Sequence, residues 1–545
     1  MKSTAWLIAL LSPLCLFSQS KKFTFKLGEE YELPKHTADV AFIGNQKNGI
    51  VNLSLKKEDM NIIRFNPKSL SVAMQDKIDL DVSKNFDSEI VTDFAGTDQY
   101  YWIYSDWDKK SEKEMLFYDQ IDLAKAKLNQ SHTKMFETTK VAGTAMITTG
   151  LYSYKMANKY QFDYDADRSR LLVSYRLYPE VRNDKKNYDK LGFQVFNSKL
   201  EKLWGGEYKM PYTEAVMDNS DFSIDGNGNA YLLAKVYNDD SRKEKDKETG
   251  APAYHFEILK FVKDASVPVV TPVVLENNFI RFATLIENPQ HDMVIACTYS
   301  KKSKGTGTDG VFLAVLDKEG KIVKYKNGYY EFPKDELVKF ESDRLKRKME
   351  KSDYENPDLR VHDVLIQSDG SLFFTCEEYY SKSRSYYTMG HWDYRTDYYY
   401  ENVYAADISA SGDFQWMRKI PKRQSGTIGS NLVNYTMINN LESNTLGFKL
   451  IADSTGYYFL YLDNIHNMHL QENELPKYHV NGAGGQVVVS KIDNGGNVTK
   501  ELVFDTRDED IMIYPTRFKK IYGNQFIGRA KIKKTLFQPV LISAK

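Results

Sequence analysis

The chain has 545 residues, in which 74 Lys and Arg balance 74 Asp and Glu, with 42% hydrophobic and 13% aromatic residues. Zero net charge excludes a global electrostatic field that would draw the protein onto nucleic acid or an anionic membrane, so we expect no nucleic-acid partner. The apolar content and the mixture of both charges exclude wholesale disorder. The composition is unusual in its 38 tyrosines against six tryptophans.

The first 20 residues form a predicted signal peptide. Lys2 precedes an apolar run over residues 5–17, and polar residues begin at Ser18. One positive charge, about a dozen apolar residues and small residues before a polar stretch are typical of a secretory signal, and the run is too short to span a bilayer. We predict cleavage after Ser18 or Ser20, export to the periplasm or the extracellular space, and no membrane span in residues 21–545.

The next segment, residues 23–33, is predicted to be a strand that belongs to the other end of the chain. It ends in Tyr-Glu-Leu-Pro at 31–34, and similar Pro-ended strings occur at 206–211, 328–333 and 418–421, where each ends the fourth strand of a repeated unit. The last unit stops after its third strand, at 536–543. We therefore expect residues 23–33 to supply the missing fourth strand and to remove an exposed sheet edge.

The rest of the chain repeats a four-stranded unit. Short runs rich in Tyr, Phe, Val, Ile and Leu alternate with Gly, Asn and Asp turns, which indicates strands. One tight hairpin is seen at 224–233 (IDGNGNAYLL), and a second type follows it in each unit, as at 314–322 (AVLDKEGKI). A variable loop joins the two hairpins. Units are predicted to open near Val40, Ile90, Phe162, Phe222, Phe282, Val364, Leu450 and Phe518.

This pattern resembles β-propeller repeat proteins over essentially all of residues 21–545, and it is similar to the large secreted propellers of bacteria. The predicted fold class is therefore all-β, a single propeller of four-stranded antiparallel blades, with eight blades favoured, seven as the alternative, and the ring closed by the N-terminal strand. The Trp-Asp dipeptide with its Gly-His partner, which marks WD40 repeats, does not recur from unit to unit, since Trp-Asp occurs only at 107–108 and 392–393. The string at 409–416 departs from the Asp-box of sialidases and occurs once, so neither subfamily is supported. The rival architecture, a string of β-sandwiches, does not explain the unfinished last unit.

The resemblance implies that the middle loops and the connections between blades lie on one side of the disc. Most of the length variation falls there, in the loops 178–190, 238–252, 300–310, 378–401 and 464–485. Loops held by a rigid frame often bind ligands, although they also vary wherever length costs least. We call this side the long-loop face.

The loop 378–401 is the strongest local signal, because tyrosine offers a flat ring with a hydroxyl for sugar or protein recognition. Alternatively, the loop folds over the rim and packs its rings on a neighbouring blade. The candidate ligand-binding residues are Tyr386, Tyr387, His391, Trp392, Tyr394, Tyr398, Tyr399 and Tyr400.

Two further features precede this loop in the sequence. The connection 335–351 places the apolar residues Leu337, Val338, Leu345 and Met349 on roughly one helical face, which predicts a short amphipathic helix that caps the rim. Cys297 and Cys376 fall on the second strands of neighbouring units, and blades pack about 10 Å apart, which is too far for a disulfide. We predict two buried free thiols.

The sequence contains no H-E-x-x-H, G-x-S-x-G or Gly-Lys-Ser/Thr motif, so no catalytic residue, metal or cofactor is predicted. The function predicted is a non-catalytic binding or scaffold propeller that holds a protein or polysaccharide on the long-loop face. The alternative is a glycan-active lyase or hydrolase with its site at the propeller axis, because residues that converge from different blades leave no local motif.

Overall fold

The computed structural model describes residues 22–143, 145–150, 153–179, 181, 186–273, 278–304, 307–351, 357–388, 391–429, 446–480 and 484–544. The predicted signal peptide, residues 1–20, lies outside them. The regular structure is almost entirely β-strand, which confirms the all-β class. No helix among the described residues is both long and apolar enough to cross a membrane.

Each blade is a sheet of antiparallel strands, and the first four blades follow one another along the chain. Blade 1 consists of β3 (Ala38–Asn45), β4 (Gly49–Lys56), β5 (Asp59–Phe65) and β6 (Val72–Asp79). Blade 2 consists of β7 (Asp87–Asp93), β8 (Tyr100–Asp108) and β9 (Lys113–Asp122), with β10 (Lys127–Leu128) and β11 (Thr133–Thr138) both paired to β9. A two-stranded sheet, β12 (Ala145–Gly150) and β13 (Ser153–Ala157), precedes blade 3, which consists of β14 (Tyr160–Tyr164), β15 (Arg170–Arg176), β16 (Tyr188–Asn197) and β17 (Lys202–Thr213). Blade 4 consists of β18 (Met217–Ile224), β19 (Ala230–Tyr237), β20 (Tyr254–Phe261) and β21 (Val269–Val273).

The second half of the chain continues the pattern. Blade 5 consists of β22 (Phe279–Glu287), β23 (Met293–Ser300), β24 (Gly310–Leu316) and β25 (Ile322–Glu331), followed by the helices α1 (Lys334–Val338) and α2 (Asp343–Met349). Blade 6 consists of β26 (Leu359–Ile366), β27 (Leu372–Thr388), β28 (His391–Ile408) and β29 (Phe414–Ile420), and β30 (Gln424–Gly429) with β33 (His479–Val480) extends its sheet. Blade 7 consists of β31 (Lys449–Asp453), β32 (Gly456–Asp463), β34 (Gln486–Asp493) and β35 (Val498–Asp505), with the 3₁₀ turn η1 (Ile465–Asn467) after β32. Blade 8 consists of β36 (Met512–Ile513), η2 (Pro515–Arg517), β37 (Lys519–Tyr522), β38 (Gln525–Lys531) and β39 (Leu536–Ala544), together with β1 (Phe23–Leu27) and β2 (Tyr31–Glu32).

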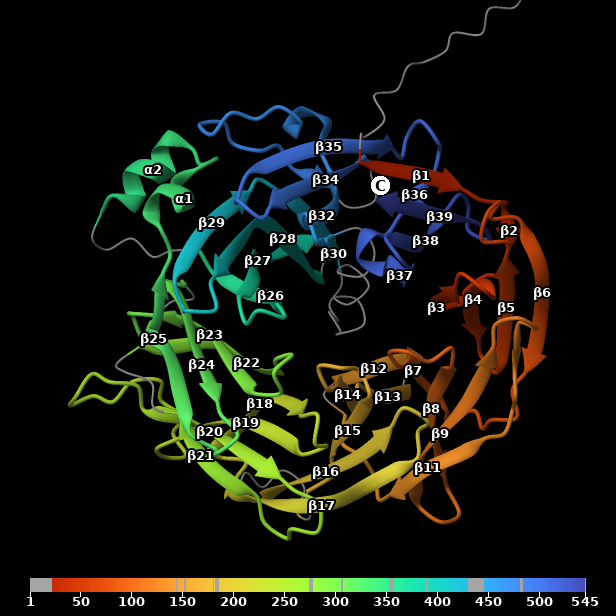
Figure 1. Ribbon diagram of the computed structural model, residues 1–545, viewed down its shortest axis with the longest axis horizontal. Coiled ribbons are helices and arrows are strands. Elements are labelled where there is room, and N and C mark those ends of the chain that lie inside the picture. The colour runs from red at the N-terminus through yellow and green to blue at the C-terminus, as the bar shows by residue number, and fades with distance from the viewer. Residues whose placement is uncertain are drawn as a thin grey trace, which may run out of the picture.

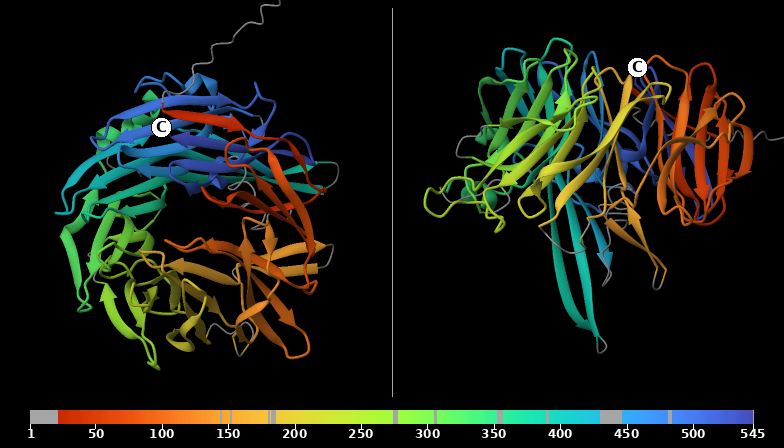
Figure 2. Two further views of the ribbon diagram at one scale, coloured as in Figure 1. Left: turned by 45° about the vertical axis from the view of Figure 1, so that its right-hand side comes forward. Right: turned by 90° about the horizontal axis from the view of Figure 1, so that it is seen from below.

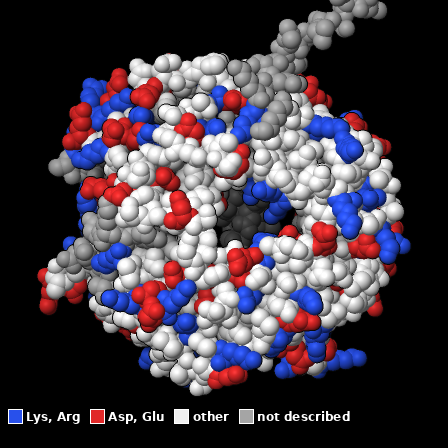
Figure 3. Space-filling view, in the orientation of Figure 1, with Lys and Arg blue, Asp and Glu red and all other residues white. Residues whose placement is uncertain are grey.

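The sheets stand around a central axis with their first strands innermost, which is the propeller arrangement predicted (Figure 1). Each predicted unit opens at one of these inner strands or next to it. The described residues form eight sheets of four or more strands, and the number of blades in the complete chain stays a prediction. The face shown in Figure 3 mixes both signs of charge and is hollowed at the axis.

The N-terminal segment closes the ring. β1 pairs with β39 in antiparallel register from Phe23 opposite Ala544 to Leu27 opposite Val540, and Tyr31 of β2 pairs with Phe537. Figure 1 shows the red β1 beside the blue strands of blade 8. β1 therefore pairs with the backbone groups of β39, which would otherwise form an exposed sheet edge.

The core is distributed among the interfaces between neighbouring blades. Trp102 of blade 2 is fully buried against Val51 and Ile62 of blade 1, and similar clusters lie between the other blades. Because both faces of a blade are covered, every residue of β23 and of β32 is buried. This explains why these strands have nearly continuous apolar sequences instead of alternating ones.

Five of the innermost strands contain a β-bulge at a similar position. In β3, β7, β18, β22 and β26 the register with the second strand shifts by one extra residue. The extra residue is Val40, Glu89, Ser220, Arg281 or His362. Bulges redirect side chains and are frequent next to functional sites. Four of the five residues are polar, so the inner strands present polar groups that a regular alternation would not predict.

The connection after blade 5 differs from the prediction. Two short helices, α1 and α2, replace the single helix expected over 335–351. Phe340 has a φ of 58°, in the left-handed region, which ends the first helix, and the Ser342 side chain accepts a hydrogen bond from the Leu345 amide to cap the second. Leu337 is buried as the apolar pattern indicated.

The tyrosine-rich segment is a hairpin and not a loop. β27 and β28 remain paired from Leu372 opposite Ile408 to Thr388 opposite His391. Figure 2 shows this teal hairpin extending well beyond the rest of the disc on one side. The prediction of a loop folded on the rim is therefore wrong. Aromatic residues favour strands, and paired tyrosines on facing strands extend the ladder.

The two cysteines are buried and free, as predicted. Cys297 lies on β23 and Cys376 on β27, the second strands of blades 5 and 6. Burial raises the pKa of both thiols above the ordinary value. Both residues therefore pack as small apolar side chains and are poor nucleophiles.

Candidate functional site

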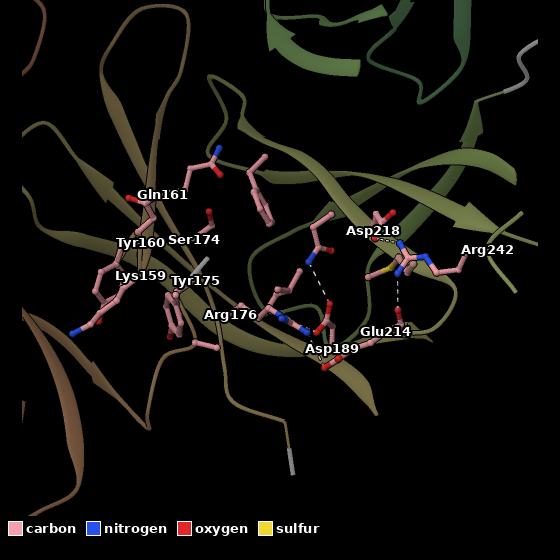
Figure 4. A pocket seen from close by; sticks show the side chains of 17 residues that line it. Lys159, Tyr160, Gln161, Ser174, Tyr175, Arg176, Asp189, Glu214, Asp218 and Arg242 are labelled. Carbon is pink, nitrogen blue, oxygen red and sulfur yellow. Dashed lines mark hydrogen bonds and ion pairs between the residues drawn. The ribbon is translucent and has the colours of Figure 1, made fainter. Parts of the chain in front are cut away.

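A polar pocket with a volume of about 950 Å³ opens between blades 3 and 4. Its walls come from the ends of β14, β15, β16 and β18, from the connection between the two blades, and from the middle loop of blade 4. These are middle loops and blade-to-blade connections, so the pocket lies on the long-loop face. Its main polar residues and its aromatic residues are Lys159, Tyr160, Gln161, Ser174, Tyr175, Arg176, Asp189, Glu214, Asp218, Asn219, Phe222 and Arg242 (Figure 4).

One side of the pocket is built from arginines that are already paired with carboxylates (Figure 4). Arg176 Nε lies 2.6 Å from Asp189 Oδ1, and its Nη2 lies 2.7 Å from Glu214 Oε1. Arg242 pairs with Asp218 in the same way. The ion pairs hold these side chains within each blade and its connection, and they leave this wall without a strong excess of either charge.

The opposite side is anchored by Lys159. Its ammonium lies 2.7 Å from Glu114 Oε1 and 3.2 Å from Asp87 Oδ2, both in blade 2. The neighbouring bulge residue Glu89 accepts a hydrogen bond of 2.6 Å from Ser105 Oγ. Burial raises the pKa of Glu89 to about 7. The negative charges of Asp87 and Glu114 add to this rise, whereas the Ser105 hydrogen bond and the positive charge of Lys159 oppose it.

Three buried polar atoms of the pocket residues have no hydrogen-bond partner within the described part of the chain. They are Ser174 Oγ, Tyr160 Oη and Asn219 Oδ1. Ser174 is only 2% exposed. A buried polar group without a partner costs about 1–3 kcal/mol, so a ligand that supplies hydroxyl groups would relieve this cost.

A second carboxyl group with a raised pKa is Asp163, two residues after the pocket residue Gln161 on β14, which adjoins the residues that line the pocket but is not one of them. Gln161 Nε2 donates a hydrogen bond of 3.2 Å to Asp163 Oδ1, whereas the buried Asp163 Oδ2 has no partner among the described residues. Burial raises the pKa of Asp163 to about 7, and the nearby Asp221 carboxylate adds to this rise. A carboxyl group with this pKa exchanges its proton near neutral pH.

Asp221 is held differently. Its Oδ2 accepts hydrogen bonds from Thr284 Oγ1 and from the Leu285 amide at 2.9 Å, both in blade 5. Burial raises the pKa of Asp221 as well, but these donors stabilise its anion. The two carboxyl groups therefore have unequal surroundings, and the proton is favoured on Asp163, whose Oδ2 has no donor.

The predicted tyrosine site lies elsewhere, on the β27–β28 hairpin. Tyr386 and Tyr387 are 48% and 63% exposed. The side chains of His391, Trp392 and Tyr394 lie outside the described residues. Tyr398 and Tyr400 are buried at the base of the hairpin, and the Tyr399 ring stacks on Tyr380 with centroids 4.6 Å apart. None of the eight lines the pocket between blades 3 and 4, and their binding role stays a prediction.

The residues of this pocket were not predicted from the sequence. They come from separate strands of two blades, and no spacing along the chain connects them. The only available signal was the polar run Asp-Asn-Ser-Asp at 218–221 in an otherwise apolar repeat.

No protein-family model and no curated protein matches this sequence. Solved structures with a similar fold include the β-propeller domain of the trilobed protease from Pyrococcus furiosus, with 9% identity, a TM-score of 0.33 and coverage of 87% of this chain and 98% of that domain. The acylaminoacyl peptidase from Pyrococcus horikoshii has 10% identity and a TM-score of 0.34, with coverage of 91% of this chain and 57% of the peptidase. The prolyl oligopeptidase B from Galerina marginata has 8% identity and a TM-score of 0.37, with coverage of 91% and 55%.

These comparisons correct one prediction. The propellers of these two peptidases belong to hydrolases, whereas a non-catalytic binding or scaffold propeller was predicted, and that prediction is not upheld. This chain spans less than two thirds of the two peptidases. At such low identity and TM-score, the similarity concerns the fold and carries no information on reaction or substrate.

Proposed function

We propose that the protein is a hydrolase of a neutral, hydroxyl-rich substrate, and that its site is the pocket between blades 3 and 4. The observation that carries this proposal is Asp163, a half-buried residue with a pKa raised to about 7 and a buried, unpartnered Oδ2 atom, next to the pocket residue Gln161. A group poised in this way can act as a general acid at neutral pH, and such catalysis contributes about 10²–10⁴-fold to a rate.

The substrate class follows from the pocket walls. The arginines Arg176 and Arg242 already have carboxylate partners, so an anionic substrate would have to displace them. The unpartnered oxygens of Ser174 and Asn219 favour hydroxyl groups, and the rings of Tyr160 and Phe222 offer apolar surface. These features fit a saccharide or a sugar ester better than a charged peptide or nucleotide.

The proposed reaction uses Asp163 twice. Protonated Asp163 donates its proton to the leaving oxygen as the bond from carbon to that oxygen breaks. Water then forms the new bond to carbon, and its proton returns to the Asp163 carboxylate, so the catalyst is regenerated. Asp221 acts as a positioning residue, since its negative charge helps to keep Asp163 protonated.

The experiment is a hydrolysis assay with neutral p-nitrophenyl glycosides, p-nitrophenyl esters and neutral oligosaccharides, in which the first two groups separate glycosidic from ester cleavage. Asp163→Asn keeps the shape of the side chain but removes its proton chemistry, and we expect at least a 100-fold loss of turnover. The exposed Asp79→Asn is the matched control and should retain wild-type turnover. Turnover of the wild type should fall as the pH rises through about 7. Equal rates for the two variants, or no turnover across the panel, would contradict the proposal.

We also propose, from the sequence of residues 1–20, that the protein is exported. Fractionation of cells that express the full chain is expected to show the shortened protein outside the cytoplasm. Retention of the uncut chain in the cytoplasm would contradict this.

A further inference from the structure

A second cavity lies at the seam where the ring closes. It has a volume of about 680 Å³ and is formed by the connection from β2 to β3, the region of η2, β38, and the turn from β38 into β39. Blade 8, the closing N-terminal segment and blade 1 all contribute to it. The seam pocket lies on the long-loop face, because it too is lined by a blade-to-blade connection and a middle turn.

The seam pocket is strongly basic although the whole chain has no net charge. Five cationic side chains and one carboxylate line it: Lys35, Arg517, Arg529, Lys531 and Lys534 against Asp39. The pocket between blades 3 and 4, in contrast, has an anionic partner for each of its cations. This local excess would attract a negatively charged ligand.

The most informative residue of the seam pocket is Arg529. It is only 8% exposed, and its Nε and Nη1 have no hydrogen-bond partner within the residues the structure describes. The Asp39 carboxylate lies 3.8 Å from Nη1, which is too long for a hydrogen bond, and Asp39 Oδ1 already accepts one from Asn52 Nδ2 at 2.9 Å.

The plane of the guanidinium is fixed by packing. Its central carbon lies 4.4 Å from the centroid of the Phe537 ring. Arg517 lines the same pocket, and burial together with the positive charge of Arg529 lowers its pKa. Arg517 is half-buried, whereas Arg529 is buried. Two cations that repel each other in a partly desolvated pocket are costly without an anion beside them, and the guanidinium fork suits two oxygens of one phosphate or sulfate group.

We propose that the seam pocket binds a tetrahedral oxyanion group, a phosphate or sulfate, with Arg529 as its central ligand and Arg517 beside it. Lys531 and Lys534 supply further positive charge from β38 and the turn after it. The volume exceeds that of an inorganic ion, so the group is carried by a larger molecule. A bound anion would hold the connection from β2 to β3 against blade 8, and it would thereby stabilise the closed ring.

The test is calorimetric titration of the full-length mature chain with inorganic phosphate and with sulfate at constant ionic strength. We expect saturable binding, weakened at least tenfold in Arg529→Gln and about threefold in Lys534→Gln, which removes a peripheral charge. The exposed Lys247→Gln, in the middle loop of blade 4, is the matched control and should bind as the wild type does.

Thermal unfolding provides the second readout, because a ligand that binds only the folded state raises the melting temperature. The rise with phosphate should occur in the wild type and in Lys247→Gln but not in Arg529→Gln. Tighter binding of phosphate than of sulfate at pH 8, where both are dianions, would favour a phosphate group as the ligand, and tighter binding of sulfate would favour a sulfate group. Either result supports the proposal. No saturable binding to the wild type, or unchanged affinity in Arg529→Gln, would overturn the proposal.

Discussion

The raised pKa of Asp163 has a measurable consequence for stability. Because the folded protein holds this proton more tightly than the unfolded chain, stability contributed by the protonated form is lost as the pH rises from about 4 through about 7. The rise from the ordinary value of 3.8 to about 7 corresponds to about 4 kcal/mol at 1.36 kcal/mol per pKa unit. Asp163 is half-buried, so we expect roughly 2–4 kcal/mol after solvent screening.

Asp163→Asn tests this value, since asparagine is always neutral. Urea unfolding of both proteins, followed by fluorescence at pH 4 and at pH 8.5, gives the difference in the free energy of unfolding at each pH. We expect nearly equal stability at pH 4 and a variant more stable than the wild type by roughly 2–4 kcal/mol at pH 8.5. All other titrating groups are common to the two proteins and cancel. A difference that does not change with pH would contradict a raised pKa of Asp163 in the folded protein.

Three other predictions follow from burial. Phe23→Ala, in the closing strand at 3% exposure, should lower the free energy of unfolding by about 3 kcal/mol, while Val267→Ala, at 71% exposure, should change it by less than about 0.5 kcal/mol; equal effects would contradict closure by β1. Cys297 and Cys376 should resist alkylation in the folded protein and both react in denaturant without a reductant, and mass spectrometry that shows a linked pair would contradict the blade assignment. Tyr387→Ser should leave the melting temperature unchanged, because this ring is 63% exposed on the hairpin, and a large decrease would mean that the hairpin tip packs on the disc.

The fold could be predicted because each repeated unit contains short sequence patterns that are typical of strands and tight turns. The turn strings around Gly228 and Gly412 require a left-handed backbone, and both glycines have a φ of 82°. The segment that ends at Pro34 and the incomplete last unit together indicated the closing strand. As predicted, β1 and β2 pair with β39 of the last blade. These features depend on residues that are close together in the sequence.

The functional residues could not be predicted in the same way. Asp163 and Asp221 lie on the inner strands of different blades, and their pKa values depend on burial that no spacing reveals. The bulge at Glu89 could not be predicted from the sequence either, because it depends on the register between β7 and β8. The segment around Tyr386 was predicted to be a loop and is a projecting hairpin, because an exposed run of aromatic residues is compatible with either conformation.

The measurement that tests the proposed function most directly is a crystal structure of Asp163→Asn with a neutral oligosaccharide. The variant keeps the pocket intact while it prevents turnover. We predict electron density for the sugar between blades 3 and 4, with hydroxyl groups bonded to Ser174 and Asn219 and a glycosidic oxygen about 3 Å from residue 163. Sugar bound only on the β27–β28 hairpin or at the propeller axis, with an empty pocket, would contradict the account.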